Sequence, residues 1–269
     1  MKRTTGSDFV FQIFALIISI IIVHAAYVTV IRPNANAIHK EQLARQAAGE
    51  PFVPQRSVYV VLQDYEQETC FVLMLWAIFI MGNKARLTNQ ERRILRRPLL
   101  PVSEGISILP EDSREFSRPL QNLPETEQSM LLPRTLLTAL QRFTATKNVA
   151  AVASAVKDVC DTESERLDSE LSMVRYIAWA IPSIGFIGTV RGIGEALGQV
   201  HEAIEGDIAG VTASLGVAFN STFIALVISI FVMFFAHQLQ LLQERLVLNT
   251  QQYCDSNLLS HLKVPETKE

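Results

Sequence analysis

Apolar side chains are concentrated in four runs, and the segments between them are charged and contain prolines. The runs cover residues 9–31, 69–82, 176–198 and 208–236. A lipid core of about 30 Å needs about 20 helical residues, and the first, third and fourth runs reach that length. The second has about fourteen apolar residues, so it spans only if its helix begins near Val58. We predict an all-α membrane protein with four transmembrane helices.

The last two runs predict a transmembrane hairpin, because about seven residues join them. Glycines crowd the first arm, at Gly185, Gly188, Gly192, Gly194 and Gly198. Hydroxyl and amide groups occur along the second arm, at Thr212, Ser214, Asn220, Ser221 and Thr222. Small residues let helix backbones approach closely in lipid, and polar groups at membrane depth face other helices or a water-filled path. We therefore expect the hairpin to face protein, and an ion.

Charge predicts the orientation of the four spans. Residues 84–97 contain six Lys or Arg residues opposed only by Glu91, and such clusters favour the cytoplasmic side. Four spans then place both termini in the cytoplasm. The hairpin turn, which holds Glu202, Glu205 and Asp207 and no Lys or Arg, lies outside. A cleaved signal peptide ending at Ala35-Asn36-Ala37 is disfavoured, because the first apolar run is longer than a usual signal core.

The predicted segments follow the order of the chain. They are a cytoplasmic N-terminus with the first span (1–31), a periplasmic connector (32–68), the second span (69–82), a basic and then proline-rich cytoplasmic connector (83–133), cytoplasmic helices (134–175), the third span (176–199), a periplasmic turn (200–207), the fourth span (208–236), and a cytoplasmic helix and tail (237–269).

The cytoplasmic segments show two patterns. Six prolines between residues 98 and 133 predict an extended connector, because each disfavours helix in the residue before it. From Arg134 an apolar stripe predicts helix, with a break near residues 144–146. No helix breaker precedes the third span, so one long helix should run from the cytoplasm to Pro182. After the fourth span, residues 237–262 predict an amphipathic helix. The third and fourth spans therefore have long cytoplasmic helical extensions.

Composition excludes several classes of function. The net charge of −3 argues against nucleic-acid binding. Three cysteines far apart in sequence indicate free thiols, and no Cys or His spacing suggests a metal site. The sequence has no Ser/His/Asp constellation, phosphate-binding loop or HExxH motif. We expect a protein that is not an enzyme and that holds neither a metal nor a cofactor.

Two threonines and one arginine are the candidate functional residues of the hairpin. Thr189 and Thr222 lie near mid-membrane by count, where a hydroxyl can ligate a cation or a water chain, or can simply bond its own helix carbonyl. Arg191 is costly in a span, and Glu195 lies one helical turn further on. The two form either an interfacial ion pair or a charge at the mouth of an ion path. Pro182 should kink the third span.

Two segments of the hairpin carry a family resemblance. PSIGFIGTVRGI, at residues 182–193, resembles the pore helix of the MotA/TolQ/ExbB proton-channel family, in which a proline precedes spaced glycines and a Gly-Thr pair. AFNSTFIAL, at residues 218–226, is similar to that family's small-residue segment and places Thr222 at the matching threonine. The likeness in motifs covers about residues 160–237. Two positions depart from the family: Val217 replaces a glutamate of the ExbB and TolQ branches, and Arg191 replaces an uncharged residue.

The resemblance implies a homopentamer in the bacterial inner membrane. It would enclose two copies of a single-span partner of the MotB, ExbD or TolR kind, whose transmembrane aspartate accepts the ion. Thr189, Thr222, Asn220 and Ser221 would line the path, and Pro182, Gly185, Gly188 and Gly192 would shape it. Ion flow, of protons or sodium ions, would then drive rotation of ring against core. The chain has no acidic residue deep in an apolar run, which fits this division of labour.

We therefore expect a ring-forming subunit of an ion-driven motor complex. The alternative is a non-conducting membrane scaffold or anchor for a cytoplasmic complex, in which the glycines serve oligomer packing only. A small transporter is a weaker third hypothesis, because the hairpin has no internal repeat.

Overall fold

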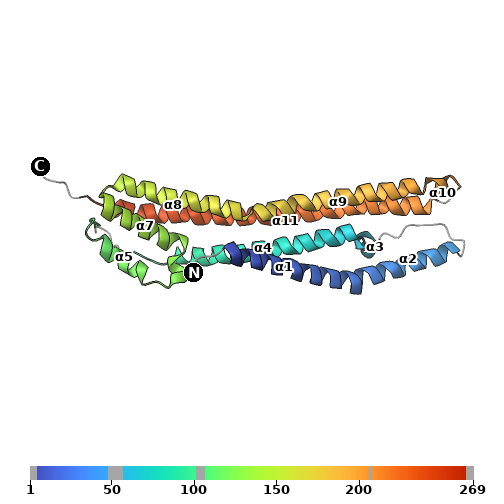
Figure 1. Ribbon diagram of the computed structural model, residues 1–269, viewed down its shortest axis with the longest axis horizontal. Helices are drawn as coiled ribbons and strands as arrows, with labels where there is room; N and C mark the ends of the chain where they lie inside the picture. The colour runs from blue at the N-terminus through green and yellow to red at the C-terminus, as the bar shows by residue number, and fades with distance from the viewer. Residues whose placement is uncertain (1–4, 48–56, 101–106, 206–207, 265–269) are drawn as a thin grey trace. The chain divides into compact units, whose positions relative to one another are not determined.

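The computed structural model describes residues 5–47, 57–100, 107–205 and 208–264, and the regular structure in these residues is helical (Figure 1). Ile108 and Leu262 form an isolated parallel bridge. Four helices are long and apolar enough to cross a membrane, which confirms the predicted fold class at this level. Parts of the predicted N-terminus, connectors, turn and tail lie outside the described residues; among them are Pro51, Pro54 and Asp207.

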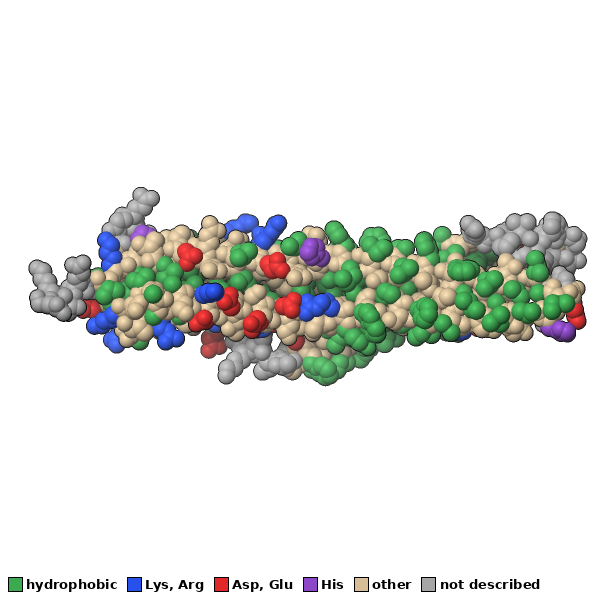
Figure 2. Space-filling model, turned by 90° about the horizontal axis from the view of Figure 1, so that it is seen from above, with side chains coloured by type: hydrophobic (Ala, Val, Ile, Leu, Met, Phe, Trp, Pro, Cys, Tyr) green, Lys and Arg blue, Asp and Glu red, His purple; other side chains and the backbone are tan. Residues whose placement is uncertain are grey.

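The chain divides into two compact units, each described separately below. We call the first the apolar unit; it comprises Thr5–Met81 and Met173–Ala236. The second, the polar unit, comprises Gly82–Ser172 and His237–Glu269. Large hydrophobic side chains of the apolar unit are exposed, among them Phe186, Phe219 and Ile230, as expected for surfaces that meet lipid or another chain. Figure 2 shows many such side chains, as well as a region rich in Lys, Arg, Asp and Glu.

The apolar unit is built from the predicted spans and their short extensions. Its elements are α1 (Thr5–Ala26), a π-helical turn η1 (Tyr27–Ile31), α2 (Arg32–Ala47), α3 (Val58–Leu62), the first part of α4 (Tyr65–Ile94), α9 (Ser172–Gly198), α10 (Val200–Ile204) and the first part of α11 (Ala209–Asn257). The first helix thus continues past the end of its apolar run as α2.

A break precedes α4 and separates it from α3. We had expected one helix from about Val58, but the helix begins again at Tyr65. Gln67 explains the new start, because its Oε1 accepts a hydrogen bond from the backbone N–H of Asp64 at 2.9 Å, as in half of a capping box. The break places three acidic residues, Asp64, Glu66 and Glu68, at the start of α4.

The polar unit is a helical cluster around one hydrophobic core. Its elements are α5 (Ser113–Gln121), α6 (Glu125–Gln128), α7 (Leu131–Thr146), α8 (Val149–Glu170), the rest of α4 and α11, and a 3₁₀ turn η2 (Leu259–His261). Leu136, Leu140 and Phe143 of α7 are fully buried with Val152 of α8 and Leu258. The predicted break is present: Lys147 is left-handed (φ 50°) and Asn148 caps α8.

Two predictions about the segments that we had expected to be cytoplasmic need correction. The proline-rich segment contains α5 and α6, and Pro119 lies inside α5. The helix forms because it buries Leu120 completely, and this packing overrides the local effect of proline. The long helix predicted to run into the third span is interrupted at Leu171, and α9 then runs through Pro182, which lies inside the predicted third span.

A buried carboxylate joins α7 to α8. The Glu163 side chain is 3% exposed, and its Oε2 accepts hydrogen bonds from Arg134 Nη2 at 2.8 Å and Arg166 Nε at 3.1 Å. Each arginine is partly exposed, so solvent shares the cost of burying the charge. The carboxylate is therefore fully paired.

Replacing Glu163 by Gln should lower the free energy of unfolding by about 3 kcal/mol, because two arginines lose their buried counter-charge. The midpoint of thermal unfolding of the purified protein in detergent measures the change. Glu165→Gln, on the exposed face of α8, is the matched control and should change stability by less than about 0.5 kcal/mol. Equal shifts in both variants would contradict the assignment.

Candidate functional site

Glycines of α9 lie directly against α11 of the same copy. A Cβ added to Gly188 would lie 2.6 Å from the Ser221 Cβ, and one added to Gly192 would lie 2.7 Å from the Ser214 carbonyl oxygen. At Gly185 the added atom would collide with the Cβ of Ala225. Real side chains do not fit at such distances, so these three positions bring the two backbones together. Figure 1 shows α9 and α11 side by side.

Thr189 and Thr222 meet across this contact. Their hydroxyl oxygens are within hydrogen-bonding distance of each other. Thr189 Oγ1 can also donate to the carbonyls of Ala218 at 3.0 Å and Gly185 at 3.3 Å, and Thr222 Oγ1 to that of Gly185 at 3.0 Å. Each hydroxyl has one proton, so these bonds are alternatives. Bonding to the threonine's own helix is therefore only part of the arrangement.

Ser221 and Asn220 differ in their surroundings. Ser221 is buried, and its Oγ lies 3.5 Å from Gln67 Nε2 of α4. Asn220 is half-buried, and its side chain makes no hydrogen bond within the described part of the chain. The structure thus connects Ser221 to a helix that the sequence had not linked to the hairpin.

Pro182 removes one backbone bond from α9, and α11 replaces it. A proline at this position cannot donate to the carbonyl of Ala178, four residues earlier. Ser229 Oγ of α11 donates to that carbonyl at 3.1 Å. A side chain from the neighbouring helix therefore satisfies the freed acceptor, as expected in lipid.

Arg191 pairs with Glu195, as the spacing predicted, and with a second carboxylate that we had not predicted. Arg191 Nη1 is 2.9 Å from Glu195 Oε1, while its Nε and Nη2 donate to the two carboxylate oxygens of Glu66 at 2.7 and 2.9 Å. Asp64 Oδ1 lies 4.0 Å away. Burial raises the pKa of the Asp64 carboxyl despite the attraction of Arg191. Asp64 Oδ2 is buried and has no hydrogen-bond partner within the described residues.

Glu68 faces the other way, toward the first helix. Its two oxygens contact His24 Nδ1 at 2.7 Å and Arg32 Nη2. The Arg32 guanidinium also lies over the rings of Tyr27 at 5.6 Å and Tyr65 at 4.4 Å, which are cation–π contacts. The sequence signal for Glu66 and Glu68 was three acidic residues directly before an apolar run, which we had interpreted only as connector charge.

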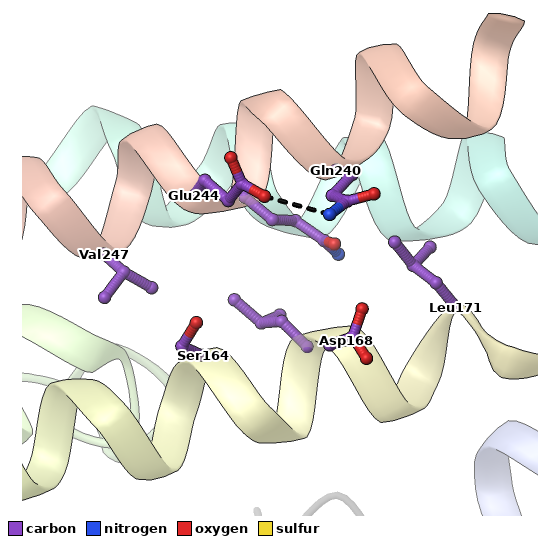
Figure 3. A pocket seen from close by; sticks show the side chains of 8 residues that line it. Ser164, Asp168, Leu171, Gln240, Glu244 and Val247 are labelled. Carbon is purple, nitrogen blue, oxygen red and sulfur yellow. Dashed lines mark hydrogen bonds between the residues drawn. The ribbon is translucent and has the colours of Figure 1, made fainter.

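A second polar feature lies in the polar unit, between α8 and α11. It is a cavity of about 20 Å³ that has room for one water molecule. Ser164, Asp168, Gln240 and Glu244 line it, and Gln240 donates to Glu244 at 3.0 Å (Figure 3). Within the described residues, no group of three or more His, Cys, Asp and Glu side chains could hold a metal ion.

A protein-family model matches part of the chain. The model of the MotA/TolQ/ExbB proton channel family matches residues 127–252. The match therefore includes Pro182, Thr189, Arg191 and Thr222 but not Glu66. No curated protein matches the chain.

Gly185→Leu should destabilise the hairpin by about 3 kcal/mol, because the close contact with Ala225 leaves no room for a side chain. Thermal unfolding in detergent measures the change. Gly194→Leu is the matched control on the same helix, since nothing lies within 4 Å of a Cβ there. If both substitutions had the same small effect, the packing role of Gly185 would be wrong.

Proposed function

Because the model of the MotA/TolQ/ExbB proton channel family matches residues 127–252, we propose that this chain is the ring-forming subunit of an ion-driven motor complex in the bacterial inner membrane. The ring conducts protons or sodium ions along α9 and α11 to a transmembrane aspartate of a partner protein. Binding and release of the ion at that carboxylate convert the ion gradient into mechanical work.

The contact between Thr189 and Thr222 carries this proposal. Both residues are half-buried within one copy, so each side chain is held by the hairpin and is partly exposed at its surface. Hydroxyl groups that can alternate between several partners can donate and accept hydrogen bonds, so they can join a water chain that carries a proton or can ligate a cation. A partner helix packed on this surface would bring its aspartate to the hydroxyls.

The exposed faces of the spans support an oligomer. Only 22% to 33% of the most apolar window in each long helix is buried within a single copy. The remaining surface is available to lipid and to other chains. We propose a homopentamer around two single-span partners of the MotB, ExbD or TolR kind, with both termini of this chain in the cytoplasm.

Thr189→Val and Thr222→Val should each reduce ion flux by about 100-fold, because valine keeps the shape but removes the hydroxyl. Flux is measured in vesicles that contain the complex purified with its co-isolated partner, using proton-sensitive and sodium-sensitive dyes. Thr212→Val is the matched control: Thr212 is exposed on α11 and donates to the carbonyl of Ile208, the residue directly before that helix. Full flux in both hairpin variants would refute the path.

Imaging the purified complex tests the ring. We expect several copies around a central partner, and a single copy or a closed bundle without an axial space would contradict the proposal. A normal ring without ion flux in the unmodified complex would favour the scaffold alternative.

A further inference from the structure

The charges around Arg191 do not balance. Three carboxylates, those of Glu66, Glu195 and Asp64, lie within 4.0 Å of one guanidinium, which leaves a formal charge of −2. Glu195 alone, one turn away on the same helix, would neutralise Arg191. A second and a third carboxylate are therefore more than an ion pair requires, and the surplus charge is costly because the side chains of Glu66 and Asp64 are only 12% and 16% exposed.

The neighbouring cluster on α4 does balance. Glu68 has one arginine partner, Arg32, and it also contacts a histidine, His24. That arrangement is the one expected of an ion pair that only joins two helices. The contrast indicates that the negative charge around Glu66 is a local property and not a general consequence of the acidic start of α4.

Glu66 also lies beside the hydroxyl-bearing part of the hairpin. The Glu66 Cγ and the Ser221 Oγ lie 3.2 and 2.8 Å from the position where a Gly188 Cβ would be. The two side chains therefore share the bare face of Gly188, the residue that precedes Thr189. Ser221 in turn precedes Thr222, and Gln67 of α4 lies 3.5 Å from its hydroxyl.

We propose that Glu66 is an ion-path residue that each copy of the chain supplies from α4, one step outward of the threonines. This inference rests on the proposed function. A proton from water bonds to a Glu66 carboxylate oxygen, and Arg191 keeps Glu195 as its partner. The proton then leaves to water beside the Ser221 and Thr222 hydroxyls, and the Glu66 carboxylate pairs with Arg191 again. A sodium ion would be ligated by the same oxygens.

A charge-neutral pair of substitutions separates this role from a structural one. If Glu66 only neutralises Arg191, then Glu66→Gln should impair the complex and Glu66→Gln with Arg191→Gln should restore it. If Glu66 carries the ion, flux should stay about 100-fold below that of the unmodified complex in both variants. Full flux in either variant would overturn the proposal. The double variant keeps the net formal charge of this cluster at −2, the same as in the unmodified protein, so its flux decides the question even if the single variant does not assemble.

Two comparisons complete the experiment in the same vesicles. Glu68→Gln, combined with Arg32→Gln to keep its own cluster neutral, should retain at least half of the flux. If it loses as much as the Glu66 variants, the effect is a general one of α4 and the proposal is wrong. Thr189→Val separates a failure of this inference from a failure of the proposed function. If Thr189→Val loses flux while the Glu66 variants keep normal flux, the role of Glu66 is refuted and the proposed function stands. Proton and sodium dyes identify which ion is lost.

Discussion

The close approach of α9 and α11 is the constraint on which the arrangement of the apolar unit depends. It exists because Gly185, Gly188 and Gly192 have no side chains on the face that meets α11. Since lipid provides no hydrophobic drive between helices, contact of this kind comes from backbone packing and polar bonds. The same approach brings the threonine hydroxyls together and lets Ser229 reach across to α9. A bulkier residue at one of these glycines would push the two helices apart and so break all of these contacts at once.

Charge is the second organising feature, and the acidic residues at the start of α4 determine which cations are paired. Alternate residues at its first turns point in different directions, so Glu66 binds the hairpin and Glu68 binds the first helix. Gln67, between them, is fully buried and fixes the start of the helix. A two-residue break before Tyr65 therefore determines which carboxylate meets which cation. The charged groups of the first half of the chain and those of the hairpin form connected networks inside the apolar unit.

Local patterns predicted the helices well, and they predicted contacts within one helix. The pair Arg191 and Glu195 followed from a spacing of four residues, and the break between α7 and α8 from a loss of periodicity. Glu66 could not be predicted in the same way, because its partner is more than a hundred residues away and the contact depends on where α4 begins. Helix α5 was missed for a related reason: burial of Leu120 in the polar unit outweighs the prolines that dominate the local sequence. Whether Thr189, Thr222 and the glycines serve ion flow stays a prediction.

The bond from Ser229 to Ala178 has a structural consequence. α9 lacks the backbone hydrogen bond to the Ala178 carbonyl, and the Ser229 hydroxyl of α11 donates to that carbonyl instead. The carbonyl that proline leaves without a donor is therefore satisfied from the other arm of the hairpin. Loss of the Ser229 hydroxyl would leave that acceptor unpaired where no water is available to replace it.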